Sequence, residues 1–394
     1  MISLDEALTI IADKIHPLKG THTCNLKNAL GKIVAEDIYA AKSLPPFTNT
    51  GVDGYAFYHD EGTKDFQIIG ASYAGEPFQG VLEKGQAARI ATGAVLPAGA
   101  DSVAMQEICD VDGNHLHIRE LPEQGANIRK AGHDIAKGDI VARKGKTLTI
   151  QDIAIFGALG ITDVKVTRPV KIAVASSGME LANADTKAHD GMIIDTNTLM
   201  VSQMVSSPRT EVTSLPSIAD NYDATVIALK NAAKAHDIII TTGGVSVGDR
   251  DFIRDVLHDH GDVLFWKIAI RPGKPVLVAK IGDCIVVGLP GNPVSAFVTC
   301  HVIVKKIIHA LNGQNIHLPD GFPVTLANDI TKPDHLRCFI RANYADGQAH
   351  TYKDQSSNLY SSLTQSTGLI DLEAGRSSFK KGDRVIYRPY CLFD

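Results

Sequence analysis

A run of three isoleucines places the strongest constraint on the fold of this chain. Ile238, Ile239 and Ile240 lead directly into Thr-Thr-Gly-Gly, and the loop continues to Asp251 before a helical pattern begins. An unbroken apolar strand is typical of a parallel sheet that is covered on both faces. Ligands bind beyond the carboxyl ends of the strands in such sheets. The loop at residues 241–251 is therefore predicted to line a binding site.

The region around this strand alternates between strand and helix patterns. Apolar runs predict further strands, at residues 170–175, 263–267, 276–279 and 284–287. Apolar periodicity predicts helices among them, at residues 196–205, 222–235 and 293–311. This alternation indicates a doubly wound α/β domain.

The flanking regions follow different patterns. Short strand-like segments separated by turn residues predict a β-rich domain, with strands at residues 66–69, 87–90, 102–105 and 115–118. Helical patterns at residues 3–15, where Ser3 and Glu6 resemble a capping box, and at 149–159 lie on either side of it. Their placement suggests that the two helices pack together and that the β-rich region is an insertion. After residue 318 the pattern is again β-like, with no strong helix.

Size and composition narrow the classes of function. A chain of 394 residues exceeds what one core usually supports, so several domains are expected. The net charge of -5 argues against a nucleic-acid-binding protein. The six cysteines show no paired metal-ligand spacing, which is typical of reduced thiols in the cytosol. With no signal-peptide pattern and no apolar run of about 18–20 residues, a soluble, cytoplasmic enzyme is expected.

The loop after the isoleucine strand has the composition of an anion cradle. Gly243 and Gly244 let the backbone approach a ligand closely, and Thr241, Thr242 and Ser246 supply hydroxyls. The loop is neither a Walker A motif nor a GxGxxG motif. A plain tight turn is the alternative, but the hydroxyls on both sides and the acids that follow favour phosphate binding.

Two acids at the end of this loop are candidates for metal binding. Mg²⁺ is usually held by one or two carboxylates together with phosphate oxygens. Asp249 and Asp251 are placed for that role, although both can instead cap the next helix. Metal binding is favoured for Asp251, and both interpretations stay open for Asp249.

Other strand exits carry similar chemistry. Lys267, Arg271 and Lys274 cluster around a Pro-Gly turn and suit a polyanionic ligand, although a solvated turn has the same appearance. Residues 288–293 bring glycines and Asn292 to a helix start, and residues 176–180 follow the first apolar strand. Together with the loop at residues 241–251, the loops at 288–293 and 176–180 make three strand exits with glycines and small polar residues, which predict one ligand cleft.

Two further motifs lie outside the α/β region. Asp53 sits in a glycine-flanked turn at residues 50–56, and Arg129 and Asp134 lie in a second turn at residues 127–134. Each motif alone is ordinary turn chemistry.

Taken together, these motifs resemble the MoeA family of molybdenum insertases, which includes the E domain of gephyrin. The resemblance covers essentially the whole chain, because the motifs occur in the family's order. They lie at residues 52–56, 127–134, 176–180, 241–251, 265–275, 289–295 and 355–362. The implied fold has four parts: a discontinuous linker domain (1–40 and 138–168), an inserted β-rich domain (41–137), a molybdopterin-binding α/β domain (169–315) and a small C-terminal β domain (316–394).

The resemblance also implies a reaction and partners. The family inserts molybdate into adenylylated molybdopterin, with Mg²⁺-dependent cleavage of the pyrophosphate bond and release of AMP. A head-to-tail homodimer is implied, in which Asp53, Arg129 and Asp134 reach the cleft of the other subunit. The upstream adenylyltransferase is a further expected partner, and neither nucleic acid nor a membrane is expected.

By motif position, the resemblance assigns roles to individual residues, while general base and metal ligand stay unseparated among the acids. The candidate catalytic residues are Asp53, Asp134, Lys267 and Arg271. The candidate metal ligands are Asp251, Asp220 and Glu180. The candidate substrate-binding residues are Arg129, Ser177, Gly178, Glu180, Thr242, Gly243, Gly244, Ser246, Lys274, Pro290, Asn292, Arg341 and Ser357.

Some positions depart from the family pattern. Arg271 stands where lysine is common, and Ser356 and Asn358 stand where glycine is common, so the shape of the last-domain loop is open. Three alternatives compete with this interpretation. The related adenylyltransferase is usually a lone domain and lacks about 250 of these residues. A scaffold without chemistry fits poorly with the acids and Lys267, and a nicotinamide dehydrogenase lacks its fingerprint.

Overall fold

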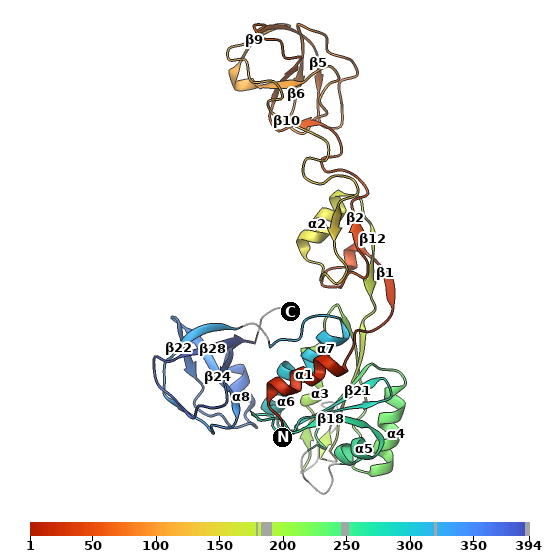
Figure 1. The fold of residues 1–394 in the computed structure, drawn as a ribbon, viewed down its shortest axis with the longest axis vertical. Coiled ribbons are helices and arrows are strands. Elements are labelled where there is room, and N and C mark those ends of the chain that lie inside the picture. Colours follow the sequence, from red (N-terminus) through yellow and green to blue (C-terminus); the bar gives the residue numbers. More distant parts are fainter. Residues whose placement is uncertain (179, 183–190, 246–251, 319–320, 391–394) are drawn as a thin grey trace. The chain divides into compact units, whose positions relative to one another are not determined.

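The structure is a computed structural model, which describes residues 1–178, 180–182, 191–245, 252–318 and 321–390 (Figure 1). The chain divides into two compact units. The larger comprises Met1–His22, Gly31–Ile33 and Thr167–Asp394, and the smaller comprises Thr23–Leu30 and Val34–Val166. The four-part division expected from the sequence stays a prediction.

A six-stranded sheet, ordered β16-β13-β17-β21-β20-β18, forms the centre of the larger unit. Four strands are parallel: β16 (Thr210–Ser214), β13 (Val170–Ser176), β17 (Ile238–Thr242) and β21 (Cys284–Leu289). β20 (Leu277–Ile281) runs antiparallel to β21, and the edge strand β18 (Asp262–Trp266) pairs antiparallel with β20. Only two residues, Gly282 and Asp283, separate β20 from β21, and such a short connection can join only antiparallel neighbours. The α/β prediction is confirmed, with this antiparallel edge as a refinement.

Both faces of the sheet are covered, as the continuous apolar strands predicted. Ile172, Val174, Ile238 and Ile240 belong to a core under α1 (Leu4–Lys14), α3 (Asn197–Val205) and the long helix α6–α7 (Pro293–Leu311). Ala173, Ala175 and Ile239 belong to a second core under α4 (Tyr222–Ala233) and α5 (Phe252–His260). The side chains divide in this way because successive residues of a strand point to opposite faces. Figure 1 shows α1, α6 and α7 grouped apart from α4 and α5.

The long helix runs through α6 (Pro293–Thr299), a π-helical segment (Cys300–Val304) and α7 (Lys305–Leu311). Its 19 residues are long and apolar enough to cross a membrane by length and composition. Most of the helix is buried inside the larger unit, which identifies it as a core helix.

The first helix corrects one expectation. α1 begins at the predicted capping box, in which the Glu6 amide donates to Ser3 Oγ (3.1 Å) and the Ser3 amide donates to Glu6 Oε2 (2.7 Å). The suggestion that it packs on the second amphipathic helix is wrong. Its apolar stripe, including Leu4 and Ile11, is buried in the core of the larger unit instead. α2 (Ile150–Ala158) packs in a separate core of the smaller unit.

A second six-stranded sheet lies near the C-terminus, in the order β19-β24-β25-β22-β28-β26. Its strands are β19 (Ile270–Arg271), β24 (Arg337–Ala345), β25 (Gln348–Thr351), β22 (Phe322–Leu326), β28 (Arg384–Pro389) and β26 (Gly368–Leu372). β23 (Ile330–Thr331) and β27 (Ser378–Phe379), from the same region of the chain, pair in a separate two-stranded ribbon. The region is β-rich as predicted, but it also contains the short helix α8 (Tyr360–Thr364). Its five residues are too few to show a helical pattern of apolar residues in the sequence.

The smaller unit is β-rich as the sequence predicted. Its main sheet has the order β7-β4-β6-β5-β9-β8. These strands are β7 (Ser102–Met105), β4 (Gly54–Phe57), β6 (Gln86–Ile90), β5 (Asp65–Ser72), β9 (His115–Ile118) and β8 (Cys109–Asp112). Short ribbons pair β2 (Ile38–Tyr39) with β11 (Ile140–Ala142), and β3 (Asn49–Thr50) with β10 (Ile128–Arg129). A further ribbon joins β1 (Thr21–Asn25) and β12 (Asp163–Thr167).

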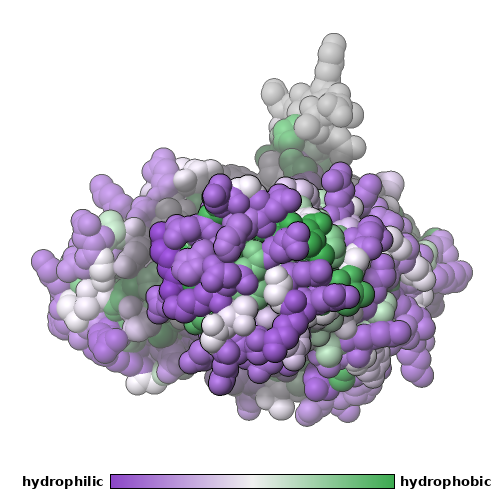
Figure 2. Space-filling model, turned by 90° about the horizontal axis from the view of Figure 1, so that it is seen from above, coloured by the Kyte–Doolittle hydropathy of each residue, from purple (hydrophilic) through white to green (hydrophobic). Residues whose placement is uncertain are grey.

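The surface has an ordinary polar character on the face that Figure 2 shows, where hydrophobic residues gather only in small patches. The cysteines in the described part of the chain are free thiols, and most of them are buried. Burial raises the pKa of the Cys284 thiol and that of the Cys300 thiol to about 12 each. These side chains therefore stay protonated and act as small core residues.

Candidate functional site

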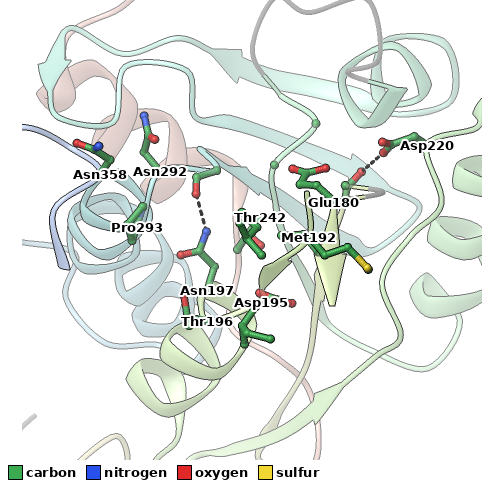
Figure 3. Close-up of a pocket in the computed structure, with 18 of the residues that line it drawn as sticks. Glu180, Met192, Asp195, Thr196, Asn197, Asp220, Thr242, Asn292, Pro293 and Asn358 are labelled. Atoms are coloured by element: carbon green, nitrogen blue, oxygen red, sulfur yellow. Dashed lines mark hydrogen bonds between the residues drawn. The ribbon is translucent and has the colours of Figure 1, made fainter. Parts of the chain in front are cut away.

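Three strands of the central sheet end at the same level. Ser176 at the end of β13 pairs with Thr242 of β17, and Thr242 pairs with Leu289 of β21. The loops that follow these strands therefore leave the sheet side by side, as the sequence predicted. They open into a cavity of about 1000 Å³ (Figure 3). The lining residues are Ser177, Gly178, Glu180, Leu181, Gly191, Met192, Ile193, Ile194, Asp195, Thr196, Asn197, Asp220, Thr242, Gly243, Gly244, Gly291, Asn292, Pro293, Asn358 and Tyr360.

The backbone conformation favours glycine at two points of this lining. A Cβ atom at Gly243 would lie 2.6 Å from the Ser177 carbonyl oxygen, and its φ of +89° is left-handed. A Cβ atom at Gly178 would lie 2.7 Å from a Glu180 carboxylate oxygen, with φ at +151°. The Gly243 amide donates to the Leu289 carbonyl (3.0 Å), so this N–H group is already used within the protein. Gly243 thus lets the exits of β13 and β17 lie close together, whereas at Gly178 the close atoms belong to the end of the Glu180 side chain.

Two carboxylates face the cavity from one side, as Figure 3 shows for Glu180 and Asp220. The Ser177 hydroxyl donates to Asp220 Oδ1 at 3.2 Å, which joins the β13 exit loop to the segment carrying Asp220. A third acid of the lining, Asp195, accepts from the Thr198 amide (3.0 Å) and hydroxyl (2.6 Å). Asp195 therefore caps the start of α3, while Glu180 and Asp220 give the cavity its acidic side.

Amide groups lie on the other side, where Figure 3 places Asn292, Pro293 and Asn358. The Asn197 Nδ2 group donates to the Gly291 carbonyl at 2.6 Å and ties the start of α3 to the loop before α6. The Val294 amide donates to the Ser357 carbonyl at 3.1 Å. Predicted residue Ser357 therefore contributes its backbone, which attaches the last-domain loop to the start of α6.

Arg341 has a different position from the one expected of an anion contact. It is 1% exposed and lies outside the cavity lining. Its Nε donates to Ser362 Oγ (3.0 Å), and its Nη2 donates to the carbonyls of Asp354 (3.3 Å) and Ser356 (3.0 Å). Burial lowers the pKa of this guanidinium. The structure therefore assigns Arg341 to holding the loop that carries Asn358 and Tyr360.

The predicted cations do not line the cavity formed by the described residues. Lys267 has a left-handed φ of +66°, and its Nζ lies 3.9 Å from the centroid of the Trp266 ring. Arg271 and Lys274 are exposed around a turn next to β19. Pro290 is also absent from the lining, although its neighbour Gly291 contributes. Their contact with ligand stays a prediction.

The remaining predicted residues lie in the smaller unit. Asp53 is exposed, and its Oδ1 accepts from the Thr92 amide (2.7 Å) and hydroxyl (3.1 Å). These bonds, the backbone one first, lower the pKa of the Asp53 carboxyl. Arg129 lies close to Gly51, where a Cβ atom would meet its Nη2 at 2.9 Å, and Asp134 is exposed. Their contribution to a partner's cleft stays a prediction.

Three predicted positions, Ser246, Asp249 and Asp251, lie outside the described residues. Other lining residues were not predicted: residues 191–197, Asn358 and Tyr360 are part of the cavity wall. The sequence Asp195-Thr-Asn197 before an apolar period signalled only a helix start. Asn358 stood out in the sequence only because glycine is common at its position in the family.

The fold and the cavity define a class of protein. Its α/β sheet ends in glycine-containing loops and carboxylates, at the edge where such sheets bind phosphorylated ligands. Residues 2–160 match the MoeA N-terminal region (domain I and II), 173–310 match a probable molybdopterin binding domain, and 323–390 match the MoeA C-terminal region (domain IV). The chain belongs to the MoeA family of molybdopterin molybdenumtransferases, enzymes of molybdenum cofactor biosynthesis.

Individual relatives agree over the whole length. The molybdopterin molybdenumtransferase of Haemophilus influenzae is 36% identical over 404 residues, covering 99% of this chain and 99% of the relative. That of Staphylococcus epidermidis is 31% identical, covering 98% and 94%. The crystal structure of the molybdopterin biosynthesis MoeA protein from Pyrococcus horikoshii superposes with a TM-score of 0.86 at 27% identity, covering 99% and 100%. The predicted fold class and family are therefore confirmed.

Proposed function

We propose that this enzyme inserts molybdate into adenylylated molybdopterin, with Mg²⁺-dependent cleavage of the pyrophosphate bond and release of AMP. The observation that carries this proposal is the cavity at the strand exits, where Glu180 and Asp220 flank the glycines of the β13 and β17 loops. Its volume of about 1000 Å³ is large enough for an extended ligand that contains two phosphates and two ring systems.

The acidic side of the cavity fits Mg²⁺. Among the described residues, no group of three or more His, Cys, Asp or Glu side chains forms a metal cage. Mg²⁺ does not require one, because it usually combines one or two carboxylates with phosphate oxygens and water. Glu180 and Asp220 supply that pair, and Asp251 is the third proposed ligand. When bound, the ion neutralises charge that develops on the phosphate oxygens.

The cleavage step adds water across the pyrophosphate. A water oxygen forms a new bond to one phosphorus, the bridging P–O bond breaks, and the products are AMP and molybdopterin carrying its own phosphate. Asp53 and Asp134 are proposed to position this water or the leaving group from the partner subunit. Thr242 and Ser177 also line the cavity. Thr242 is proposed to orient phosphate oxygens, and the Ser177 hydroxyl to hold Asp220, to which it donates.

The insertion step exchanges ligands on molybdenum. Two dithiolene sulfurs form bonds to the metal of molybdate, while one oxo group leaves as water and takes the two thiol protons. The role of the protein is to hold the dianion beside the sulfurs. Lys267 and Arg271 are proposed for this role, because molybdate needs cationic partners. A homodimer in the cytoplasm, which receives its substrate from the adenylyltransferase, completes the proposal.

The test compares three reactions of the purified protein. With adenylylated molybdopterin, Mg²⁺ and molybdate, we expect AMP release and active cofactor. AMP release that required ATP and free molybdopterin would instead identify an adenylyltransferase. Ligand binding without AMP under either condition would identify a scaffold.

A further inference from the structure

An aromatic ring lies in the wall of the cavity without a role in the chemistry above. Tyr360 is the first residue of α8 and one of the lining residues, yet 48% of it is exposed. A half-exposed tyrosine in a concave site differs from one on an open surface, because its ring is available to a ligand that fills the cavity.

The ring is held by a hydrogen bond of its own hydroxyl and by the anchoring of the loop that precedes it. Its hydroxyl is hydrogen-bonded to the Thr196 hydroxyl at the start of α3. The buried Arg341 guanidinium donates to two carbonyls of the loop that precedes it, and the Val294 amide donates to a third, that of Ser357. A ring that is already ordered loses little side-chain freedom when a ligand stacks on it.

The cavity also has distinct chemical sides. Glu180 and Asp220 make one side acidic, which suits a metal and phosphates, whereas Asn292 and Asn358 place amide groups on the other side (Figure 3). Tyr360 lies two residues beyond Asn358 in the chain. An amide side chain both donates and accepts hydrogen bonds, as does the edge of a fused heteroaromatic ring such as pterin or adenine.

We propose that Tyr360 is a stacking platform for a fused heteroaromatic ring of the ligand, with the amides of Asn292 and Asn358 at the edge of that ring. The inference rests on the proposed function for the presence of two such rings, the pterin and the adenine, in one substrate. The shared chemistry is a flat bicyclic ring with polar edges. The experiment decides which of the two rings stacks.

The test measures binding of isolated probes to the full-length protein. Pterin-6-carboxylate is followed by quenching of its own fluorescence, AMP by calorimetry, and inorganic phosphate by calorimetry as a ring-free control. Tyr360→Leu is expected to weaken one ring-bearing probe about tenfold, since stacking of one base on an aromatic side chain has this magnitude. Its phosphate affinity is expected to match the wild type.

Matched variants separate stacking from structure. Tyr360→Phe keeps the ring and is expected to bind within about threefold of the wild type, and Tyr360→Trp at least as tightly. Tyr344→Leu removes a tyrosine of similar exposure, 45%, that lies outside the cavity lining. It should change the affinity for neither pterin-6-carboxylate nor AMP. If Tyr360→Leu misfolds, the Phe and Trp variants still test the proposal. Loss of probe binding in both would overturn it.

The outcomes distinguish this inference from the proposed function. Wild-type binding of both ring probes by a folded Tyr360→Leu protein overturns the stacking role alone, provided that the wild type releases AMP. If the wild type releases no AMP but Tyr360→Leu still loses one ring probe, the proposed reaction fails and the stacking role stands.

Discussion

Replacing Gly243 by alanine tests the geometry of the strand-exit loops. An alanine at a φ of +89° costs about 1–2 kcal/mol relative to glycine. In addition, the new Cβ atom would lie 2.6 Å from the Ser177 carbonyl oxygen, about 0.8 Å short of the 3.4 Å where ordinary contact begins. The two atoms near this Cβ position, the carbonyl oxygen and carbon of Ser177, belong to the backbone, so a main-chain segment must move.

That movement has a calculable consequence. The Ser177 amide is bonded to the Thr242 carbonyl, and the Gly243 amide to the Leu289 carbonyl, both at 3.0 Å. Loss of one such bond adds about 1 kcal/mol to the backbone cost of about 1–2 kcal/mol, so Gly243→Ala is expected to destabilise the larger unit by about 2–3 kcal/mol. At about 2–4 °C per kcal/mol for a domain of this size, the thermal midpoint should fall clearly, and the Ser177 and Thr242 side of the cavity should deform.

Gly382→Ala is the matched control, because its φ is +90° and a Cβ atom there meets nothing within 4 Å. It should show only the backbone cost, about 1–2 kcal/mol, with normal AMP release. Midpoints by calorimetry and AMP release by chromatography, measured below both transitions, compare the two variants. Equal activity of Gly243→Ala and Gly382→Ala would refute the need for close-packed strand exits.

Three further predictions address charge and positioning. Glu180→Gln and Asp220→Asn should each raise the Mg²⁺ concentration for half-maximal AMP release about 10- to 100-fold, read from Mg²⁺ titrations; unchanged titrations would exclude both as ligands. Burial raises the pKa of the Asp237 carboxyl, but hydrogen bonds from Arg168 and from the Lys171 amide lower it by more. The pKa of Asp237 in the folded protein is therefore below its usual value. Its stabilising contribution is therefore complete above a pH of about 4 and lost as the pH falls through the lowered pKa, so Asp237→Asn should lower the thermal midpoint at pH 7 and reduce the acid sensitivity of that midpoint. Arg341→Lys loses the fork that holds three acceptors, and we expect KM to rise about tenfold with a smaller change in kcat; an unchanged KM would contradict the loop-holding role.

Local sequence predicted the strand exits well, for a physical reason. The isoleucine strand β17 and the apolar strand β13 are buried on both faces. Their apolar runs, and the points where these runs end, can therefore be recognised in the sequence without knowledge of the fold. Ser177 and Gly178 follow β13, and Thr242 ends β17 just before Gly243; the structure brings all four into one cavity.

The part of the cavity wall that contains Asn197 and Tyr360 could not be predicted from local sequence. Asn197 and Tyr360 are separated by more than a hundred residues, and only tertiary packing brings them to the same cavity. Likewise, the apolar stripe of α1 predicted a buried face but not the surface that buries it. The burial of Arg341 could have been predicted from one signal. It stands two residues after Phe339, which is fully buried, and alternate residues of a strand such as β24 share one face.

The most direct test of the central claim is the stoichiometry of one enzyme-excess reaction. The protein, Mg²⁺ and molybdate are mixed with a limiting amount of adenylylated molybdopterin, and AMP and pterin-bound molybdenum are quantified together. We predict one AMP and one inserted molybdenum per substrate molecule, with neither product when Mg²⁺ is omitted. AMP without inserted molybdenum, or insertion with the pyrophosphate bond intact, would contradict the proposed function.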